Sequence, residues 1–376
     1  MIIGIDASRA VISHKTGTEN YAFSLIKAIA KIDPHSEYRL YFNSKNEVGL
    51  VNQENFKEVP IYSPKLWTQY RLSKEMFLNK IDILFVPAHT LPVLRPRNLK
   101  TVVTIHDLGA QYLKEYHQFP HRLYLNKTTE YAIGNATEII TVSHSTEKEM
   151  IEDYKGDPGK ITVIYEGYDR EVYHFDRIKN ATDENQNVLT RYKIDKPYLL
   201  FVGTIQPRKN IKRLIKAFSK IDNNELILVL AGKKGWMFED IIQLPSKLGI
   251  SDRVRFLDYV KGEDLPYLYY QAQVFVFPSL CEGFGIPLLE AMALGCPVVT
   301  ANLSSMPEVV GEAGYLVDPY SVESIKKGIE EVINNKKRRK EMQKAGQIRA
   351  EEFSWEKAAS ETLKVFEKIK AKINQR

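Results

Sequence analysis

Two glutamates separated by seven residues frame a loop that is suited to a charged, hydroxyl-rich ligand. Glu282 and Glu290 enclose Gly283 and Gly285, directly after the apolar run 274–277 and at the expected start of a helix. Glycine lets the backbone approach a ligand closely, and the N–H groups of a helix start favour an anion. Two carboxylates beside a phosphate would repel it, unless they accept hydrogen bonds from hydroxyl groups. The loop is therefore typical of a site that holds sugar, phosphate and ribose together, which favours a nucleotide sugar as the ligand.

Three further side chains of matching chemistry follow apolar runs elsewhere in the chain. Arg208 and Lys209 come shortly after the run 198–202, where two cations would neutralise a diphosphate and the charge that grows on it as a glycosidic bond breaks. A salt-bridged helix start is the structural alternative for this pair. His106 follows the run 102–105, where a single histidine is either a structural residue or part of the site. Because ligands of open α/β sheets bind at the carboxyl ends of strands, we expect all three at the site.

This set of residues resembles a known family. The segment from Glu282 to Glu290 is similar to the Glu-x7-Glu motif of retaining glycosyltransferases with the GT-B fold, in glycosyltransferase family four. Pro-Arg-Lys-Asn at 207–210 is similar to that family's phosphate-binding segment, and Phe-Ser-Trp at 353–355 to the start of its terminal helix. The resemblance implies a catalytic set that consists of Glu282, His106, Arg208 and Lys209.

The resemblance also implies a set of residues that bind the donor. Glu290 would hold the ribose, and Glu282 with His106 would hold the sugar. Gly17 lies in a loop similar to the family's glycine loop, although a plain helix cap explains that loop as well. The predicted donor set is Glu290, Gly283, Phe284, Gly285, Ile286, Gly17, Gly203, Lys233, Tyr259, Val260 and Leu265, of which the last four surround the base. His89 is a candidate for the acceptor side.

The sequence favours chemistry without a metal ion. It contains no Asp-x-Asp, the motif by which another large class of nucleotide-sugar transferases binds a divalent cation. We therefore expect no metal and no other cofactor, with basic side chains and a helix end in the place of the ion. The resemblance implies retention of configuration by a front-face route, in which the leaving phosphate oxygen accepts the acceptor's proton. The expected donor is GDP-mannose or a UDP-hexose, with mannose favoured by analogy, and the expected acceptor is a glycan or lipid-linked hydroxyl.

Short apolar runs alternate with amphipathic helical patterns, which is typical of doubly wound α/β proteins. The expected strands form two series, at 2–5, 39–42, 83–86, 102–105, 138–142 and 161–165, and at 198–202, 226–231, 254–257, 274–277 and 297–300. The polar stretch 175–196 predicts a loop that joins two domains. We expect a GT-B architecture with Rossmann-like domains at 1–190 and 191–355, which face an interdomain cleft. A C-terminal helix, 356–376, is expected to cross back to the first domain.

Composition excludes several other classes of protein. The 376 residues, 44% hydrophobic and 27% charged, describe a globular chain of about two domains. No apolar run approaches the roughly 18 residues that span a membrane, and the N-terminus lacks the features of a signal peptide, so we expect a cytoplasmic protein. The net charge of +6 is concentrated in the second half, as suits a phosphate-bearing ligand. The basic run 336–340 has no interleaved aromatic residues, and we expect no nucleic acid partner.

Several alternatives share this architecture. A dinucleotide oxidoreductase would carry Gly-x-Gly-x-x-Gly after its first strand, which this chain does not. A GT-B sugar-nucleotide epimerase and a non-catalytic nucleotide-sugar-binding protein remain as alternatives. The segment 65–77 mixes aromatic, apolar and basic residues, and predicts either an amphipathic helix on a membrane surface or a helix that packs on the acceptor side. If the segment is a membrane-surface helix, we expect the protein to be bound peripherally at the inner face of the membrane.

Overall fold

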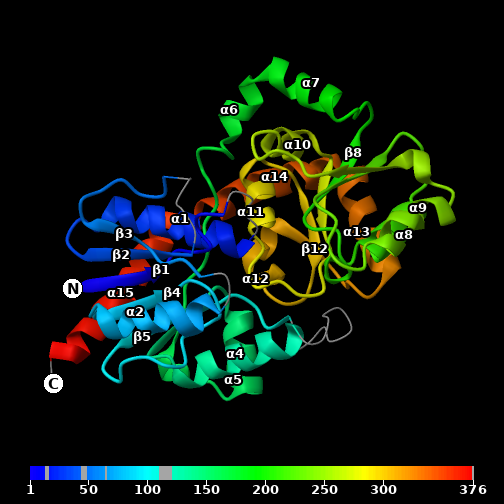
Figure 1. Cartoon of the computed structure of the whole chain (residues 1–376). Helices are drawn as coiled ribbons and strands as arrows, with labels where there is room; N and C mark the ends of the chain where they lie inside the picture. Colours follow the sequence, from blue (N-terminus) through cyan, green and yellow to red (C-terminus); the bar gives the residue numbers. More distant parts are fainter. Residues whose placement is uncertain (13–16, 44–48, 64–65, 110–120, 375–376) are drawn as a thin grey trace. The chain divides into compact units, whose positions relative to one another are not determined.

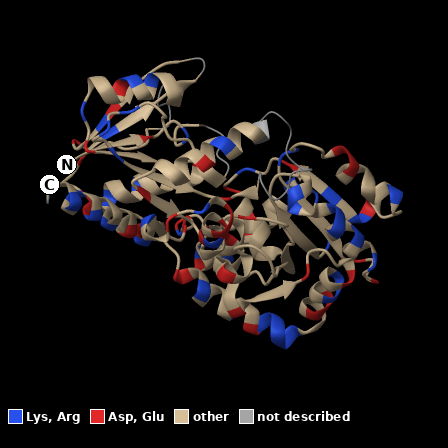
Figure 2. Cartoon of the chain, turned by 90° about the horizontal axis from the view of Figure 1, so that it is seen from below, with Lys and Arg blue, Asp and Glu red and all other residues tan. Residues whose placement is uncertain are grey.

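The computed structural model describes residues 1–12, 17–43, 49–63, 66–109 and 121–374. The chain divides into two compact units, and each is built on one parallel sheet. The first unit contains residues 1–167 together with 355–376, and the second contains residues 168–354. Lysines and arginines are interspersed with acidic residues along most of the helices of both units (Figure 2). Within the described ranges, no helix combines the length and the apolar character that crossing a membrane requires.

The first unit contains a seven-stranded parallel sheet in the order β3-β2-β1-β4-β5-β6-β7 (Figure 1). Its strands are β1 (Ile2–Asp6), β2 (Glu37–Phe42), β3 (Phe56–Pro60), β4 (Ile83–Val86), β5 (Lys100–Ile105), β6 (Glu138–Thr141) and β7 (Ile161–Val163). The order reverses where β1 lies beside β4, with Ile3 opposite Ile83. Such a reversal point leaves room for a ligand beyond the strand ends, so the loops after β1, β4 and β5 are where this unit can hold one.

Helices cover the first sheet, and the chain returns to it at its end. They are α1 (Gly17–Ile32), the π-helix η1 (Trp67–Leu72), α2 (Ser73–Leu78), α4 (His121–Asn135), α5 (His144–Tyr154), η3 (Pro158–Lys160) and α15 (Trp355–Asn374). The terminal helix α15 packs against α1. It is also fixed to the sheet by charge, because Lys368 and Lys372 lie 2.7 and 2.8 Å from the two carboxylate oxygens of Glu138, which is fully buried at the start of β6.

The second unit contains a six-stranded parallel sheet in the order β10-β9-β8-β11-β12-β13. Its strands are β8 (Tyr198–Val202), β9 (Ile227–Ala231), β10 (Val254–Asp258), β11 (Val274–Phe277), β12 (Val298–Ala301) and β13 (Gly314–Val317). The central strands β9, β11 and β12 are buried along their whole length, as expected of a sheet covered on both faces. The order reverses between β8 and β11, where Phe275 pairs with Leu200. The loops after these two strands therefore leave the sheet side by side.

The helices of the second unit include the connections between its strands. They are α6 (Phe175–Asn180), α7 (Thr182–Arg191), η4 (Pro207–Lys209), α8 (Ile211–Ser219), α9 (Glu239–Lys247), η5 (Ser251–Arg253), α10 (Leu265–Gln271), α11 (Ile286–Ala293), α12 (Met306–Val310), η6 (Gly311–Ala313), α13 (Val322–Asn334) and α14 (Lys336–Glu351). The short η4 follows β8, and α11 follows β11. Arg208 and Lys209 lie in η4, Glu290 lies in α11, and Glu282 lies in the loop between β11 and α11.

The structure corrects the sequence prediction in the stretch 175–196. This stretch was expected to be a loop, but it forms α6 and α7, which pack on α10. Its apolar stripe is narrow, and Val188 is the buried aliphatic residue of α7. The buried amide of Asn185 completes the packing by donating to the carbonyl groups of Ile178 and Ala181. The division between the units accordingly falls after residue 167, whereas the sequence placed the domain boundary after residue 190.

Candidate active site

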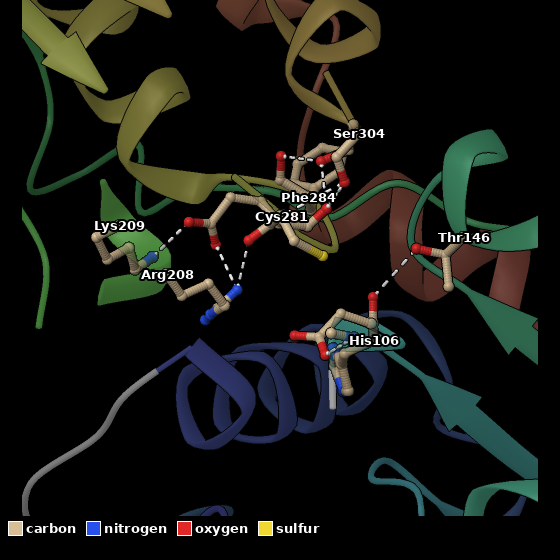
Figure 3. Close-up of polar contacts among 11 residues, drawn as sticks. His106, Thr146, Arg208, Lys209, Cys281, Phe284 and Ser304 are labelled. Carbon is tan, nitrogen blue, oxygen red and sulfur yellow. Dashed lines mark hydrogen bonds and ion pairs between the residues drawn. The ribbon is translucent and has the colours of Figure 1, made fainter. Parts of the chain in front are cut away.

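The reversal point of the second sheet joins the basic pair to the glycine loop. Lys209 donates from its Nζ to Oε1 of Glu282 over 2.7 Å, and Arg208 donates from Nη1 to Oε2 over 3.3 Å (Figure 3). Glu282 is only 8% exposed. Burial by itself raises the pKa of this carboxyl, but the charges of Lys209 and Arg208 hold it below its ordinary value. The cluster is therefore a carboxylate clamped by two cations, with a net charge of +1.

Backbone contacts fix the basic pair to the glycine loop. Arg208 donates to the carbonyl of Cys281 over 2.6 Å, and its own carbonyl accepts from the N–H of Leu280 over 2.9 Å. Asn210, which adopts a left-handed conformation with φ of 59°, donates from its side chain to the carbonyl of Pro278 over 3.0 Å. Hydrogen bonds thus join the loop after β8 to the loop after β11, and they hold the charged groups in place.

Two serines hold the glycine loop from the opposite side. Ser304 and Ser305 lie between β12 and α12, and both donate to the carbonyl of Glu282, over 2.6 and 2.9 Å. Ser305 also lies 2.8 Å from the carbonyl of Phe284, whose ring packs edge-on against Phe353. These contacts fix the backbone on both sides of Gly283. Ser304 lies at the loop in Figure 3.

The glycine loop ends in a sharp turn into α11. Gly285 is the residue before the helix and has a φ of 113°, a conformation that residues with a side chain rarely adopt. Pro287 follows in the first turn, where its missing N–H costs no helical hydrogen bond. Phe284 and Ile286 are buried, so what these positions offer a ligand is their backbone rather than their side chains.

Glu290 occupies the second turn of α11 and is held by tyrosines. Tyr269 of α10 donates its hydroxyl to Oε2 over 3.0 Å, and the Tyr173 hydroxyl also hydrogen-bonds to this carboxyl. Burial raises the pKa of Glu290, and the hydrogen bonds from the two hydroxyl groups lower it. The net result is a pKa of about 7. Asp169 adds a further charge that raises it. This carboxyl therefore keeps its proton to a higher pH than an ordinary glutamate does.

The positions predicted to surround the base lie at the ends of neighbouring strands. Lys233 follows β9 and its ammonium lies 4.8 Å from the ring centre of Tyr259, which follows β10 and is exposed. Val260 is buried, and Leu265 begins α10. Gly203, at the end of β8, lies against Gly232, which follows β9. A Cβ at position 232 would be only 1.9 Å from the carbonyl oxygen of Gly203. The two strand ends can meet this closely because residue 232 has no side chain.

In the first unit, His106 is buried at the end of β5 and has protein partners on both ring nitrogens. Its Nε2 donates to the carbonyl of Pro87 over 2.8 Å, and Nδ1 lies 3.4 Å from Oε1 of Glu166. The ring packs edge-on against Tyr21 at 4.6 Å. The backbone carbonyl of His106 accepts from Thr146, as Figure 3 also shows. The orientation of the imidazole is therefore fixed by the protein itself.

Other polar groups of the first unit gather at the same sheet edge. His89 lies 5.8 Å from His106 between ring centres, and burial lowers its pKa to about 4. Arg9, after β1, forms an ion pair of 2.7 Å with the buried Glu19 of α1. Gly17 is exposed at the start of α1 with open space around it, while residues 13–16 of its loop lie outside the described residues.

Sequence reasoning missed the groups that support these side chains. Ser305 and Tyr269 lie in segments that the sequence motifs did not include. Glu166 follows the carboxyl end of β7. A signal was present for Glu166, because a glutamate directly after the run 161–165 occupies the same kind of position as His106 after its strand. No local pattern indicates that Tyr173 and Tyr269 converge on Glu290, since their convergence arises from the packing of the chain onto α10 and α11.

Taken together, the second unit contains two partly buried cations, a helix start preceded by glycines, and two carboxyls with different pKa values, and this set of groups can bind an anion. Cations and backbone N–H groups bind phosphate, and carboxylates bind hydroxyl groups. None of these contacts requires a covalent intermediate on the protein.

Two family models match the chain. "Glycosyl transferases group 1" matches residues 183–349, and "Glycosyltransferase Family 4" matches residues 16–172. The chain is 34% identical over 271 residues to the O-antigen chain mannosyltransferase B of Escherichia coli, a match that covers 71% of this chain and 70% of that protein. It is 30% identical to the serotype-specific mannosyltransferase WbdA of the same species over 76% of this chain, but this match covers only 34% of WbdA.

Among solved structures, the chain is similar to sucrose-phosphate synthase from Thermosynechococcus elongatus. The TM-score is 0.80 at 20% identity, and the match covers 98% of this chain and 99% of that one. At this level of identity the similarity concerns the fold. It agrees with two Rossmann-like units and a helical C-terminus.

Proposed function

The chain belongs to glycosyltransferase family 4, and on that premise we propose that it transfers a mannosyl residue from a nucleotide diphosphate sugar to a hydroxyl of a glycan or lipid-linked acceptor. The observation that carries the proposal is the cluster of the buried Glu282 with the partly buried Lys209 and Arg208 beside the start of α11. In one place it supplies charge for a diphosphate and an acceptor for sugar hydroxyls. The cytoplasmic location expected from composition, with contact at the inner face of the membrane, is part of this proposal.

The proposed roles follow from the charges. Arg208, Lys209 and the backbone amides from Gly283 to Ile286 bind the diphosphate and stabilise the negative charge that it gains as the sugar leaves. Glu282 accepts hydrogen bonds from the sugar, and Glu290 from the ribose. His106 is assigned to the sugar by the family resemblance, and its fixed ring supports a positioning role.

GDP-mannose is the proposed donor, because two of the similar proteins are named as mannosyltransferases. A UDP-hexose is the competing donor. A thermal-shift screen with GDP, UDP, ADP and their common sugars separates the two, since a ligand that binds only the folded state raises the melting temperature. We expect the largest shift with GDP-mannose. A shift confined to UDP-hexoses would change the proposed donor, and no shift with any of these ligands would contradict the proposed function.

Retention of configuration is proposed through front-face attack, with the leaving phosphate oxygen taking the acceptor's proton. The contacts of the second unit support this route, because they position and stabilise charge rather than supply a nucleophile. Proton NMR of the first product formed distinguishes the anomers directly. A product of inverted configuration would contradict the route.

Metal independence is the remaining part of the proposal, and the two cations that pair with Glu282 support it. Assays in EDTA are expected to retain most of the transfer activity. Complete loss in EDTA, with recovery on addition of Mn²⁺, would show that the cations do not suffice.

A further inference from the structure

We propose that an exposed apolar face of the first unit docks onto a phospholipid bilayer with anionic headgroups. The face consists of Leu66, Tyr70, Phe77 and Leu78 on the segment η1–α2, Val93 and Leu94 on the following loop, and Tyr124 on α4. This inference identifies the surface for the membrane contact named above, and it rests on the proposed function insofar as the acceptor is lipid-linked.

The segment η1–α2 presents large apolar side chains on both of its sides. Trp67, Leu72 and Met76 are buried in the core of the first unit. Leu66, which directly precedes η1, is exposed by 69%, and Tyr70 and Phe77 on the outer side of η1 and α2 are exposed by 61 and 59%. A helix that only packs on the unit would carry polar residues on that outer side.

The loop after β4 extends the face, because hydrogen bonds attach it to η1–α2. Gln69 donates to the carbonyl of Leu91 over 3.0 Å and accepts from the N–H of Val93 over 2.9 Å. Ser73, at the start of α2, donates to the carbonyl of Leu94. Val93 and Leu94 are therefore held beside the helix with their side chains exposed, Leu94 by 69%.

Helix α4 adds an aromatic residue on the other side of this loop. The hydroxyl of Tyr131 donates to the carbonyl of Val93 over 3.2 Å, and Arg95 ties the same loop to the carbonyl of Asn135. Tyr124 lies seven residues before Tyr131 and so on the same side of α4. Its ring is exposed. Three segments that hydrogen bonds tie to one another thus expose large apolar side chains, which monomeric proteins usually cover.

Charge identifies the partner. Residues 61–100 contain seven lysines and arginines against two acidic residues, whereas the remainder of the first 190 residues contains 16 against 22. Arg71 and Lys74 are exposed on the same helical segment as the apolar side chains. An anionic bilayer surface binds apolar groups that lie next to cations. Aromatic and aliphatic side chains bind at the headgroup boundary, and lysines and arginines are attracted by the charge of the lipids. An uncharged protein partner would not account for this local excess of cations.

Sedimentation with vesicles tests the proposal on the full chain. The vesicles contain either phosphatidylcholine alone or phosphatidylcholine with phosphatidylglycerol. We expect binding to the anionic vesicles, weakened by high salt, and a loss of at least tenfold in the triple variant Leu66→Ser, Phe77→Ser and Leu94→Ser. The matched control is Ile348→Ser with Tyr320→Ser, two exposed apolar residues of the second unit, which is expected to bind as the unsubstituted protein does.

Further readouts separate this proposal from the proposed function. The triple variant should show the same melting-temperature shift with nucleotide sugars and the same transfer to a soluble acceptor. Absence of vesicle binding by the unsubstituted chain, or equal binding by the triple variant, would overturn the membrane surface while leaving the transferase assignment intact. A dimer in light scattering that the triple variant dissociates would also overturn it, because the face would then bind a second copy. Vesicle binding without any nucleotide-sugar shift would instead count against the proposed function.

Discussion

The ammonium of Lys209 lies 2.7 Å from a carboxylate oxygen of Glu282, although 73 positions separate the two residues in the sequence. They meet because β8 pairs directly with β11, so the loops that follow these strands leave the sheet together. The neighbouring guanidinium of Arg208 is also needed to hold the loop backbone, through the carbonyl of Cys281. Lys209 is thus the member of the pair whose charge can be removed with the least disturbance of the loop.

Replacement of Lys209 by methionine is expected to weaken nucleotide diphosphate binding. The variant loses a charge-assisted contact of about 1.5–3 kcal/mol, which corresponds to roughly ten- to a hundredfold in affinity. Isothermal titration calorimetry with GDP and UDP measures the loss. Lys212→Met is the matched control, since Lys212 is half-exposed on α8 and pairs with Asp240. Equal affinities for the Lys209 and Lys212 variants would remove Lys209 from the diphosphate site.

The raised pKa of Glu290 predicts a dependence of stability on pH. The carboxyl titrates near 4.5 in an unfolded chain and at about 7 in the fold, so the folded protein holds this proton more tightly. The resulting stabilisation is complete below pH 4.5 and is lost as the pH rises to about 7. The Glu290→Gln variant lacks this titration. As the pH rises from 4.5 to 7, the melting temperature of the variant should therefore increase relative to that of the unsubstituted protein. Parallel melting profiles across this range would contradict the prediction.

The same titration predicts how ribose binding responds to pH. An ionised Glu290 accepts hydrogen bonds from ribose hydroxyls better than a protonated one does. Nucleotide affinity should therefore increase as the pH rises through 7, and this increase should disappear in Glu290→Gln. Titration of the nucleotide phosphates affects both proteins alike, so the difference between them isolates the carboxyl.

Glu166 is predicted to act through His106. Removal of its carboxylate by Glu166→Ala frees Nδ1 of the imidazole and should lower the transfer rate, whereas Glu166→Gln, which keeps a hydrogen-bonding side chain, should restore part of it. In a double-mutant cycle with His106→Ala, we expect a coupling energy of about 1 kcal/mol or more in the transfer rate. Strictly additive losses would show that Glu166 has only a structural role.

The buried Glu138 predicts a large effect on stability far from the reaction. Lys368→Met with Lys372→Met leaves this carboxylate without its two cations, and the free energy of unfolding of the first unit should fall by about 3 kcal/mol. Calorimetry measures the change. The control is Lys364→Met with Lys370→Met on the exposed side of the same helix, which should alter stability little. Similar losses in both variants would point to helix propensity rather than to the buried pair.

The interior of the two sheets was predictable from the sequence, whereas two of the four edge strands were not. The eleven expected strands all form, and the nine of them that lie inside the two sheets are apolar runs largely buried between layers. The two strands that were not expected, β3 and β13, lie at the edges of their sheets, where one side of the strand meets solvent and the apolar signal is weak. Pro60 at the end of β3 further disguises it, since proline is tolerated only at such edges. Helices α6 and α7 escaped prediction for a related reason, since α7 buries one aliphatic residue and one polar residue.

The candidate site was predictable where adjacent residues carry the chemistry. The glycine loop, its glutamates and the basic pair were identified together, and the structure joins Glu282 to the basic pair, while Glu290 is held separately by tyrosines. The sequence could not show that Glu282 is paired with Lys209 and Arg208, because the ion pairs depend on the contact of two loops. The salt-bridged arrangement considered as the structural alternative for the basic pair is present, and its partner is Glu282 itself. The roles assigned by resemblance to Gly17, Lys233, Tyr259, Val260 and Leu265 stay predictions.

Glu282→Gln, assayed for nucleotide binding and sugar transfer in the same preparation, tests the central claim most directly. The substitution removes a negative charge between two cations and keeps the size of the side chain, so the affinity for GDP or UDP should be unchanged or higher. Transfer should be almost abolished, because the carboxylate no longer holds the sugar. Turnover equal to that of the unsubstituted enzyme with its accepted donor would contradict the assignment of this cluster as the donor site.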